Sequence, residues 1–214
     1  MTNNFLTQTK NKDWTGDGHS IYTTIGASNH TDDERETNDF YATSPKAVRY
    51  LLELETFDKN ILEPCCGNGH ISETLKQFGY NVTSMDLIER EYKDATFGVD
   101  FLNYWKKFSG DIITNPPYKY AQEFVEHSLS IVEDGHKVAM FLKLTFLEGK
   151  RRKELFKKQP PKIVYVSSSR LGCAKNGEFN VDKDGELDMG GAVAFAWFVW
   201  EKGYTGDTII KWFN

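Results

Sequence analysis

The sequence predicts an α/β protein with a mostly parallel β-sheet that is covered by helices on both faces. From about residue 39 onward, short apolar segments alternate with amphipathic segments that have helical spacing. Strands that alternate with helices are joined by right-handed crossovers, which place the strands side by side in one parallel sheet. Residues 163–200 instead contain apolar segments with no obvious helical pattern between them. This late change of pattern predicts an antiparallel hairpin at one edge of the sheet.

Length and composition indicate one soluble domain. The chain has 214 residues, of which 39% are hydrophobic and 27% charged, as in ordinary globular proteins. Residues 1–38 are polar without a sustained period, so we expect an irregular arm ahead of a single domain over residues 39–214. The longest apolar run, residues 192–200, is too short to span a bilayer, and the amino terminus has no signal pattern. We therefore expect an intracellular, cytoplasmic protein without membrane contacts. Three cysteines without metal-ligand spacing predict free thiols and no metal site.

The individual elements follow from apolar spacing and from capping residues. Ser44 followed by Pro45 is a helix-start pattern, and Gly79 is a helix-end residue. We expect helices over residues 45–54, 71–78, 120–132 and 147–158. We expect strands over residues 61–63, 82–85, 95–98, 111–114, 137–144, 163–166, 192–200 and 208–213. Residues 167–191 are polar and contain several glycines, which predicts a long connection.

A glycine loop follows the first predicted strand of the sheet. Gly67 and Gly69 lie between this strand and a helix, as in proteins that bind adenosine cofactors. The third glycine of the dinucleotide fingerprint is absent, because Ile71 and Ser72 occupy the positions where it would stand. Glu63, just before the loop, would repel a phosphate but could face an ammonium group. The loop therefore favours a cofactor with an amino-acid end and no phosphate.

Acidic residues follow the next two predicted strands. Asp86 ends one strand, where a carboxylate can accept two hydrogen bonds from a ribose diol. Asp100 and Phe101 could supply a hydrogen-bond acceptor and an apolar wall for an adenine ring. An ordinary strand-end turn is the alternative interpretation for all three residues.

The tetrapeptide Asn115-Pro116-Pro117-Tyr118 is the most informative motif of the chain. It follows the apolar strand 111–114 and precedes a predicted helix. Two prolines prevent the chain from continuing as a strand or starting a helix there, so an amide and an aromatic ring are left at the carboxyl end of a strand. Open α/β sheets bind their ligands at this end. A rigid turn without further role is the alternative.

Basic side chains gather in one part of an acidic chain. The whole chain has a net charge of −5, whereas residues 143–162 contain eight basic and two acidic side chains. Such a patch is either a contact surface for phosphates or the solvated face of a helix. Lys150, Arg151 and Arg152 in this patch, and Arg170 beyond it, are candidate substrate contacts.

Taken together, the motifs resemble those of S-adenosylmethionine-dependent amino-methyltransferases. The matching motifs are Tyr41 with Ser44-Pro45, Glu63-Pro64-x-x-Gly67-x-Gly69, Asp86, Asp100-Phe101 and Asn115-Pro116-Pro117-Tyr118. The likeness is greatest to DNA adenine-N6 methyltransferases, and among them to small enzymes of the phage and prophage type. It covers residues 39 to about 166.

The resemblance implies a Rossmann-like class I methyltransferase fold with a seven-stranded sheet, S-adenosylmethionine as cofactor and DNA as partner. It implies that the methionine end of the cofactor lies near residues of the segment before the first helix, namely Tyr41, Thr43 and Pro45. It carries over further cofactor contacts to Glu63, Gly67, Gly69, Asp86, Asp100 and Phe101. It assigns catalysis to the loop formed by Asn115, Pro116, Pro117 and Tyr118.

The chemistry of an aromatic amine accounts for these residue types. The lone pair of an exocyclic amine is delocalised into the ring, which makes the nitrogen a weak nucleophile. The Asn115 side-chain oxygen and the Pro116 carbonyl can accept hydrogen bonds from the amine and stabilise the positive charge that develops on it. Tyr118 can stack on a base that has been taken out of the duplex. Neither a metal nor a covalent enzyme intermediate is required.

The substrate is less well specified than the reaction. Many DNA methyltransferases have a sizeable separate target-recognition region, for which this chain has no room. Residues 167–191, the basic residues around Lys150 and the amino-terminal arm are the candidates for that role. RNA base methyltransferases and protein glutamine methyltransferases share the tetrapeptide and are the alternatives, followed by a non-catalytic cofactor-binding protein. The sequence predicts neither the recognition site nor the oligomeric state.

Overall fold

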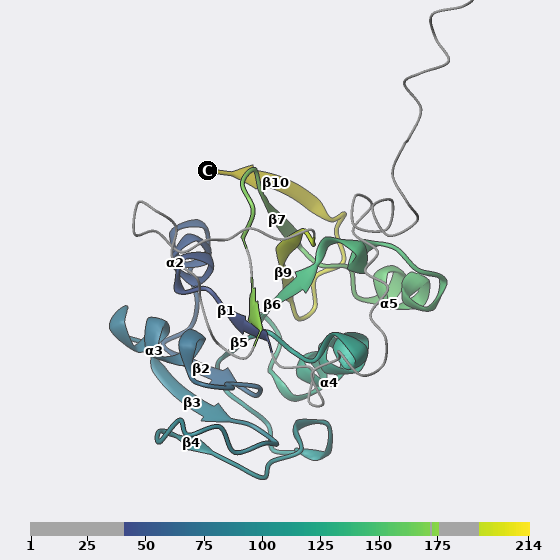
Figure 1. Ribbon diagram of the computed structural model, residues 1–214. Helices are drawn as coiled ribbons and strands as arrows, with labels where there is room; N and C mark the ends of the chain where they lie inside the picture. Colours follow the sequence, from purple (N-terminus) through teal and green to yellow (C-terminus); the bar gives the residue numbers. More distant parts are fainter. Residues whose placement is uncertain (1–40, 172, 176–192) are drawn as a thin grey trace, which may run out of the picture. The chain divides into compact units, whose positions relative to one another are not determined.

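The computed structural model describes residues 41–171, 173–175 and 193–214 (Figure 1). The predicted arm over residues 1–38 and most of the predicted connection over residues 167–191 lie outside this part. The strands are β1 (Tyr41–Thr43), β2 (Asn60–Glu63), β3 (Asn81–Met85), β4 (Ala95–Thr96), β5 (Asp111–Thr114), β6 (Lys137–Lys143), β7 (Ile163–Ser167), β8 (Cys173–Lys175), β9 (Phe195–Glu201) and β10 (Ile209–Phe213). The α-helices are α2 (Pro45–Leu54), α3 (His70–Gln77), α4 (Ala121–Ile131) and α5 (Lys153–Lys158). Four 3-10 helices accompany them: η2 (Phe101–Asn103), η3 (Tyr118–Tyr120), η4 (Leu144–Leu147) and η5 (Lys150–Arg152).

The sheet has eight strands in the order β10-β7-β9-β6-β5-β2-β3-β4. Neighbouring strands from β6 to β4 are parallel, which confirms the predicted α/β architecture. The predicted antiparallel pair exists, since β9 runs antiparallel to both β7 and β6. It is not at the edge, because β10 adds a further strand parallel to β7. The resemblance implied a seven-stranded sheet, which is wrong, because β10 is an eighth strand at the edge.

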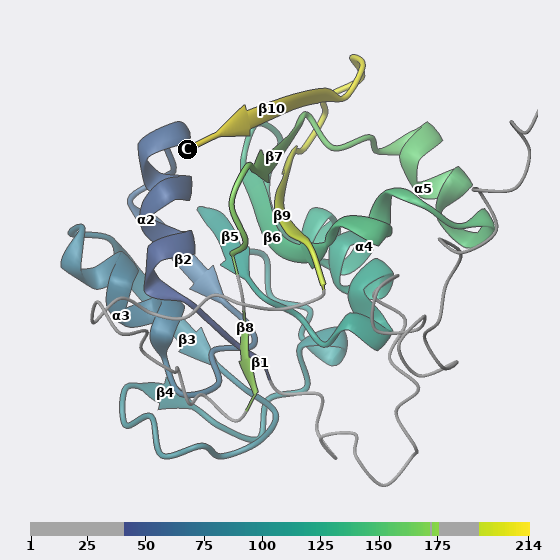
Figure 2. The ribbon, with the colours of Figure 1, turned by 45° about the horizontal axis from the view of Figure 1, so that its top comes forward.

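Side chains of the central strands alternate between two cores. On β6, Val138, Met140 and Leu142 belong to the cluster that includes α4, whereas Ala139 and Phe141 belong to the cluster that includes α2 and α3. Figure 2 shows α2 and α3 on one side of the sheet and α4 and α5 on the other. A strand buried on both faces reads as a continuous apolar run, which explains the composition of residues 137–144. None of the helices in the described part of the chain is long and apolar enough to cross a bilayer.

The predicted helices form, except the basic one. Ser44 caps α2 by accepting a hydrogen bond from the Lys46 backbone N–H at 3.2 Å, with Pro45 as first helical residue, as the sequence predicts. The expected helix over residues 147–158 is wrong in its first half. Gly149 has a φ of 128° and separates η4 from η5, so that the α-helix starts only at Lys153.

A two-stranded ribbon of β1 and β8 stands apart from the main sheet. The strands are antiparallel, and Thr43 lies opposite Cys173. The sequence did not predict this pairing, because three residues in a polar, glycine-containing connection carry no strand pattern. The ribbon matters for the site described below.

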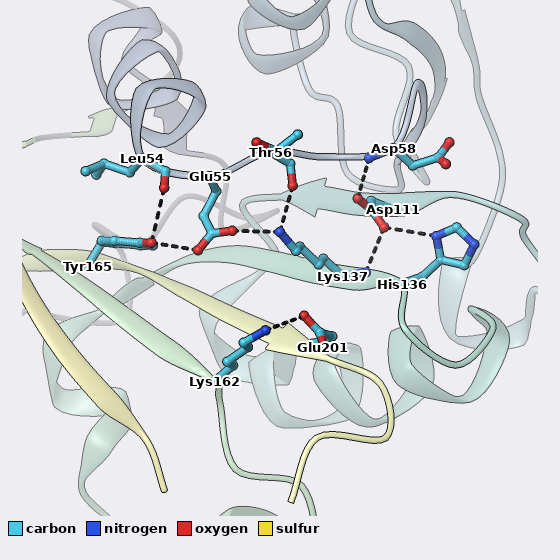
Figure 3. Close-up of polar contacts among 10 residues, drawn as sticks. All are labelled: Leu54, Glu55, Thr56, Asp58, Asp111, His136, Lys137, Lys162, Tyr165 and Glu201. Atoms are coloured by element: carbon cyan, nitrogen blue, oxygen red, sulfur yellow. Dashed lines mark hydrogen bonds and ion pairs between the residues drawn. The ribbon is translucent and has the colours of Figure 1, made fainter. Parts of the chain in front are cut away.

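A polar network joins the connection between α2 and β2 to the amino-terminal ends of β5 and β6 (Figure 3). The Asp111 carboxylate accepts hydrogen bonds from the backbone N–H groups of Asp58 at 2.6 Å and Lys137 at 2.7 Å, and contacts His136 Nδ1 at 3.1 Å. The Lys137 ammonium donates to Glu55 at 2.7 Å. Because this network lies at the opposite end of β5 from Asn115, we assign it to stability.

Replacing Asp111 with alanine should lower the free energy of unfolding by about 3 kcal/mol. The side chain is 4% exposed, so its removal leaves two partly buried backbone N–H groups without their acceptor. Urea unfolding measures the effect. Asp111→Asn, which retains one acceptor oxygen, should lose less. Equal stabilities of Asp111→Ala and the unaltered protein would contradict this assignment.

Candidate active site

The tetrapeptide Asn115 to Tyr118 lies at the carboxyl end of β5, beside the central strands β2 and β6. All four residues of β5 are buried, and the chain leaves the sheet at Asn115. Pro117 has a φ of −54° and a ψ of 119°, so the chain is neither helical nor part of the sheet at this point. Tyr118 then begins η3, and α4 follows from Ala121. The predicted strand, rigid loop and helix are thus present in this order.

The Asn115 amide is held with its oxygen free to accept. Its Nδ2 donates to the Tyr41 carbonyl at 2.7 Å and contacts the Cys173 sulfur at 3.6 Å. A carbonyl oxygen can only accept, so the contact with Tyr41 determines which end of the amide carries the nitrogen. Asn115 Oδ1 is buried and has no hydrogen-bond partner among the described residues. Such an orphaned acceptor is costly unless a ligand supplies a donor.

Tyr118 lies in a cluster of aromatic and cationic groups. Its ring centroid is 5.8 Å from that of Tyr41 and 5.6 Å from that of Phe195. The Lys143 ammonium lies 4.8 Å from the centroid of the Tyr118 ring. The Tyr118 hydroxyl contacts the Cys173 sulfur at 3.3 Å. The positive charge thus lies over one face of the ring, and a flat group that stacks on Tyr118 would share the ring with it.

The segment predicted to hold the methionine end of a cofactor adjoins this loop. The Tyr41 backbone contacts Asn115, Thr43 is 2% exposed at the end of β1, and Pro45 starts α2. The structure thus brings two motifs together that are far apart in the sequence.

The glycine loop is shaped by backbone that favours glycine. Gly67 has a φ of 53° and Gly69 a φ of 81°. Asp86, at the end of β3, accepts hydrogen bonds from the N–H groups of Gly67 at 2.8 Å and Ile88 at 2.9 Å, one on each carboxylate oxygen. A carboxylate has about four acceptor positions, so both oxygens can each take another donor. Leu87, which sequence reasoning did not single out, is 56% exposed beside this carboxylate.

Tyr92 covers the start of α3, which the sequence did not predict. A Cβ placed on Gly69 would lie 2.5 Å from the Tyr92 ring. The Tyr92 hydroxyl donates to Glu73 at 2.5 Å and accepts from Lys76 at 2.7 Å. The loop after β3 is thereby attached to α3 over the glycine loop.

Glu63 is enclosed rather than open to a ligand. Its side chain is 1% exposed and accepts a hydrogen bond from the Ser72 hydroxyl, which in turn contacts Ser84 at 2.6 Å. Burial raises the pKa of the Glu63 carboxyl to about 8. The side chain is therefore mostly neutral at pH 7, unlike the anion expected from the sequence.

The enclosed carboxyl makes stability depend on pH. The Glu63 pKa rises from 4.5 to about 8 on folding, so the folded protein retains a proton that the unfolded chain releases between these values. The free energy of unfolding should therefore fall as pH rises from 5 to 8, by on the order of 4 kcal/mol at most. Glu63→Gln, which cannot ionise, should show a flatter profile in urea unfolding. Glu53→Gln on the exposed surface of α2 is the control, and identical slopes for both variants would contradict the prediction.

Asp100 and Phe101 have structural contacts of their own. Asp100 is exposed and caps η2 by accepting from the Leu102 N–H at 3.1 Å. Phe101 is 2% exposed, and its ring centroid lies 5.3 Å from that of Phe124 and 4.9 Å from that of the His127 ring. Phe101 is thus a core residue, and its predicted role as an apolar wall for an adenine ring stays a prediction.

Of the four predicted substrate contacts, three are exposed. These are Lys150, Arg151 and Arg170. Arg152 differs, because its guanidinium donates to the carbonyls of Phe146 at 2.7 Å and Thr145 at 3.3 Å, and also to that of Glu148. Arg152 holds η4 against η5, so its guanidinium is bound to backbone carbonyls and is not available for the substrate contact suggested by the sequence. Within the described ranges, no group of three His, Cys, Asp or Glu side chains could hold a metal ion.

Comparison with known proteins identifies the fold. No protein-family model and no curated protein sequence matches the chain. Among solved structures, a proposed class I S-adenosylmethionine-dependent methyltransferase from Listeria monocytogenes matches with a TM-score of 0.55 and 13% identity, over 90% of this chain and 70% of that one. A proposed RNA methyltransferase from Pyrococcus horikoshii matches with a TM-score of 0.52 and 12% identity, over 77% and 87% of the two chains.

A third match is a modification subunit of a proposed type I restriction enzyme from Vibrio vulnificus. Its TM-score is 0.52 at 14% identity, over 84% of this chain and 48% of that one. Identities this low show a shared fold and not a shared substrate. The chain therefore has the Rossmann-like fold of class I S-adenosylmethionine-dependent methyltransferases, as the motif order predicted.

Proposed function

We propose that the protein transfers a methyl group from S-adenosylmethionine to the exocyclic N6 amine of adenine in DNA. The observation that carries the proposal is the Asn115 amide, whose buried oxygen lacks a donor among the described residues while its nitrogen is bound to Tyr41. A ligand with an N–H group would satisfy this oxygen. An amine conjugated to a flat ring would do so and would also stack on Tyr118.

The residues of the glycine loop fit the cofactor that the fold implies. Asp86 retains acceptor positions on both oxygens for the two hydroxyls of a ribose, and the exposed Leu87 offers an apolar surface for an adenine ring beside it. Gly67 and Gly69 add no side chain of their own to the loop, and the positive φ of both favours glycine. When bound, the cofactor supplies an activated methyl group on a sulfonium. Glu63 would contribute by fixing the first turn of α3 through Ser72. Asp100 accepts one hydrogen bond on each oxygen, from Leu102 and Asn103, and would retain acceptor positions for the cofactor.

The catalytic loop would act on the nitrogen of the acceptor. Asn115 Oδ1 and the Pro116 carbonyl would accept the two N–H bonds of the amine, which favours the tetrahedral nitrogen of the transition state over the planar nitrogen of the substrate. Tyr118 would hold the base by stacking. The contacts of Asn115 with Tyr41 and Cys173 come from the chain itself, so they would orient the acceptor toward the substrate.

The charges around the loop favour a nucleic acid over a neutral glutamine side chain. Lys143 lies over the Tyr118 ring, and Lys119 lies over the ring of Tyr120, which is 44% exposed. Lys150 and Arg151 are exposed on η5, which follows the carboxyl end of β6. Aromatic rings interleaved with cations suit bases and phosphates. The neighbours include both a modification subunit of a proposed restriction enzyme and a proposed RNA methyltransferase, so RNA is kept as the alternative to DNA.

Transfer of tritium from labelled S-adenosylmethionine tests the proposal. The substrates are genomic DNA that lacks N6-methyladenine, total RNA and a protein extract, each followed by hydrolysis and analysis of the labelled product. We expect the label in N6-methyldeoxyadenosine. Label in RNA or protein but never in DNA would refute the substrate that we propose.

A further inference from the structure

The Cys173 thiol lies against the catalytic loop although nothing in the sequence pointed to it. It is 3.6 Å from Asn115 Nδ2 and 3.3 Å from the Tyr118 hydroxyl. The Asn115 nitrogen has two N–H bonds, and the Tyr41 carbonyl takes one of them at 2.7 Å. Cys173 is the second described group that this nitrogen contacts. The two partners come from the two strands of the β1–β8 ribbon.

This arrangement determines where the Asn115 oxygen points. An amide that is fixed only by Tyr41 can still tilt about that one bond, and a second contact on the same nitrogen restricts the tilt. The opposite end of the amide is the buried Oδ1 without a described partner. We propose that Cys173 is a positioning residue, which holds the Asn115 amide so that Oδ1 is the free acceptor for the substrate amine. The proposal deepens the function proposed above and rests on it for its effect on catalysis.

The chemistry of the thiol suits this role. Burial raises the pKa of Cys173 to about 12, so the sulfur is a neutral thiol at physiological pH. A neutral thiol is a weak hydrogen-bond partner for both an amide and a phenol, and it adds no negative charge next to the reacting nitrogen. A thiolate there would compete with Asn115 Oδ1 for the substrate amine. Cys173 therefore acts through Asn115 and Tyr118 and not as a nucleophile.

Three variants separate positioning from packing. Cys173→Ala removes the contact, Cys173→Ser restores an acceptor for the Asn115 N–H, and Leu171→Val trims a nearby core residue that is 3% exposed. We expect Cys173→Ala to lower kcat about tenfold, the value of one hydrogen bond, with KM for both substrates within about threefold. Cys173→Ser should recover most of kcat. Leu171→Val should lower the melting temperature with kcat within about twofold.

A second readout does not require activity. In protein labelled with ¹⁵N-asparagine, the side-chain signal of Asn115 is the one that disappears in Asn115→Ala. We expect this signal to shift and its protons to exchange faster in Cys173→Ala but not in Cys173→Ser. The Asn115 signal can change in this way even if the unaltered protein methylates no substrate. In that case the positioning contact is supported and the proposed function is refuted. An unchanged Asn115 signal, or an unchanged kcat in an active Cys173→Ala protein, would overturn the inference.

Discussion

Replacing Asn115 with alanine should lower kcat at least about 100-fold, because the acceptor for the developing positive charge is removed. The affinity for S-adenosylhomocysteine should change less than about threefold, since the glycine loop and Asp86 make no described contact with the Asn115 side chain. Tritium transfer measures the first quantity and titration calorimetry the second. A loss of kcat with retained affinity for S-adenosylhomocysteine distinguishes a catalytic defect from misfolding, because a misfolded variant would lose both.

The matched control is Asn60→Ala. Asn60 is exposed at the amino end of β2, and its side chain accepts a hydrogen bond from the Asn81 side chain at 3.1 Å. The same atoms are deleted there, at the opposite end of the sheet from the loop. Its kcat should stay within about twofold of the unaltered protein. Turnover in Asn115→Ala equal to that of this control would refute the role assigned to the amide.

Replacing Asp86 with asparagine should weaken the binding of S-adenosylhomocysteine roughly 30-fold. The substitution keeps the shape of the side chain but removes its charge, and a hydrogen bond to a charged group contributes about 1.5–3 kcal/mol. The amide can still accept from one of the two backbone groups, Gly67 N–H or Ile88 N–H, so much of the loop should persist. Titration calorimetry gives the affinity directly.

Glu89→Gln provides the comparison, since it removes the same charge at an exposed position three residues further on. We expect its affinity for S-adenosylhomocysteine to remain within about threefold. If both variants lose affinity equally, the effect is one of net charge and Asp86 has no specific contact with the ribose.

Most of the fold was predictable because the central strands are buried on both faces. Residues 138–142 are a continuous apolar run, which is typical of a central strand, and the Ser44-Pro45 cap predicted the start of α2. The β1–β8 ribbon was not predictable. Each of its strands has three residues, and their pairing depends on tertiary contacts rather than on local pattern. The position of β10 outside the hairpin also depends on pairing between segments distant in sequence.

The backbone of the candidate site was predictable where local residues determine its conformation. The prolines after Asn115 and the left-handed glycines at 67 and 69 are local requirements that a sequence displays. Long side chains were harder to place. Arg152 was expected at a substrate, yet its guanidinium donates to the nearby backbone carbonyls of Phe146 and Thr145. Phe101 was expected beside a cofactor, yet burial against α4 takes its ring into the core.

The two groups that hold the Asn115 nitrogen lie 74 residues before it and 58 residues after it in the chain. Contacts of such long sequence separation form late, because the entropy lost in closing the intervening loops must be offset first. We therefore expect the amide to acquire its orientation only once β5, β1 and β8 have all reached their places. A folding intermediate that already contains the central strands and binds the cofactor would still lack an oriented Asn115 oxygen. Catalytic activity would then appear only when folding is complete. If refolding is followed by cofactor binding and by turnover in parallel, turnover should return last.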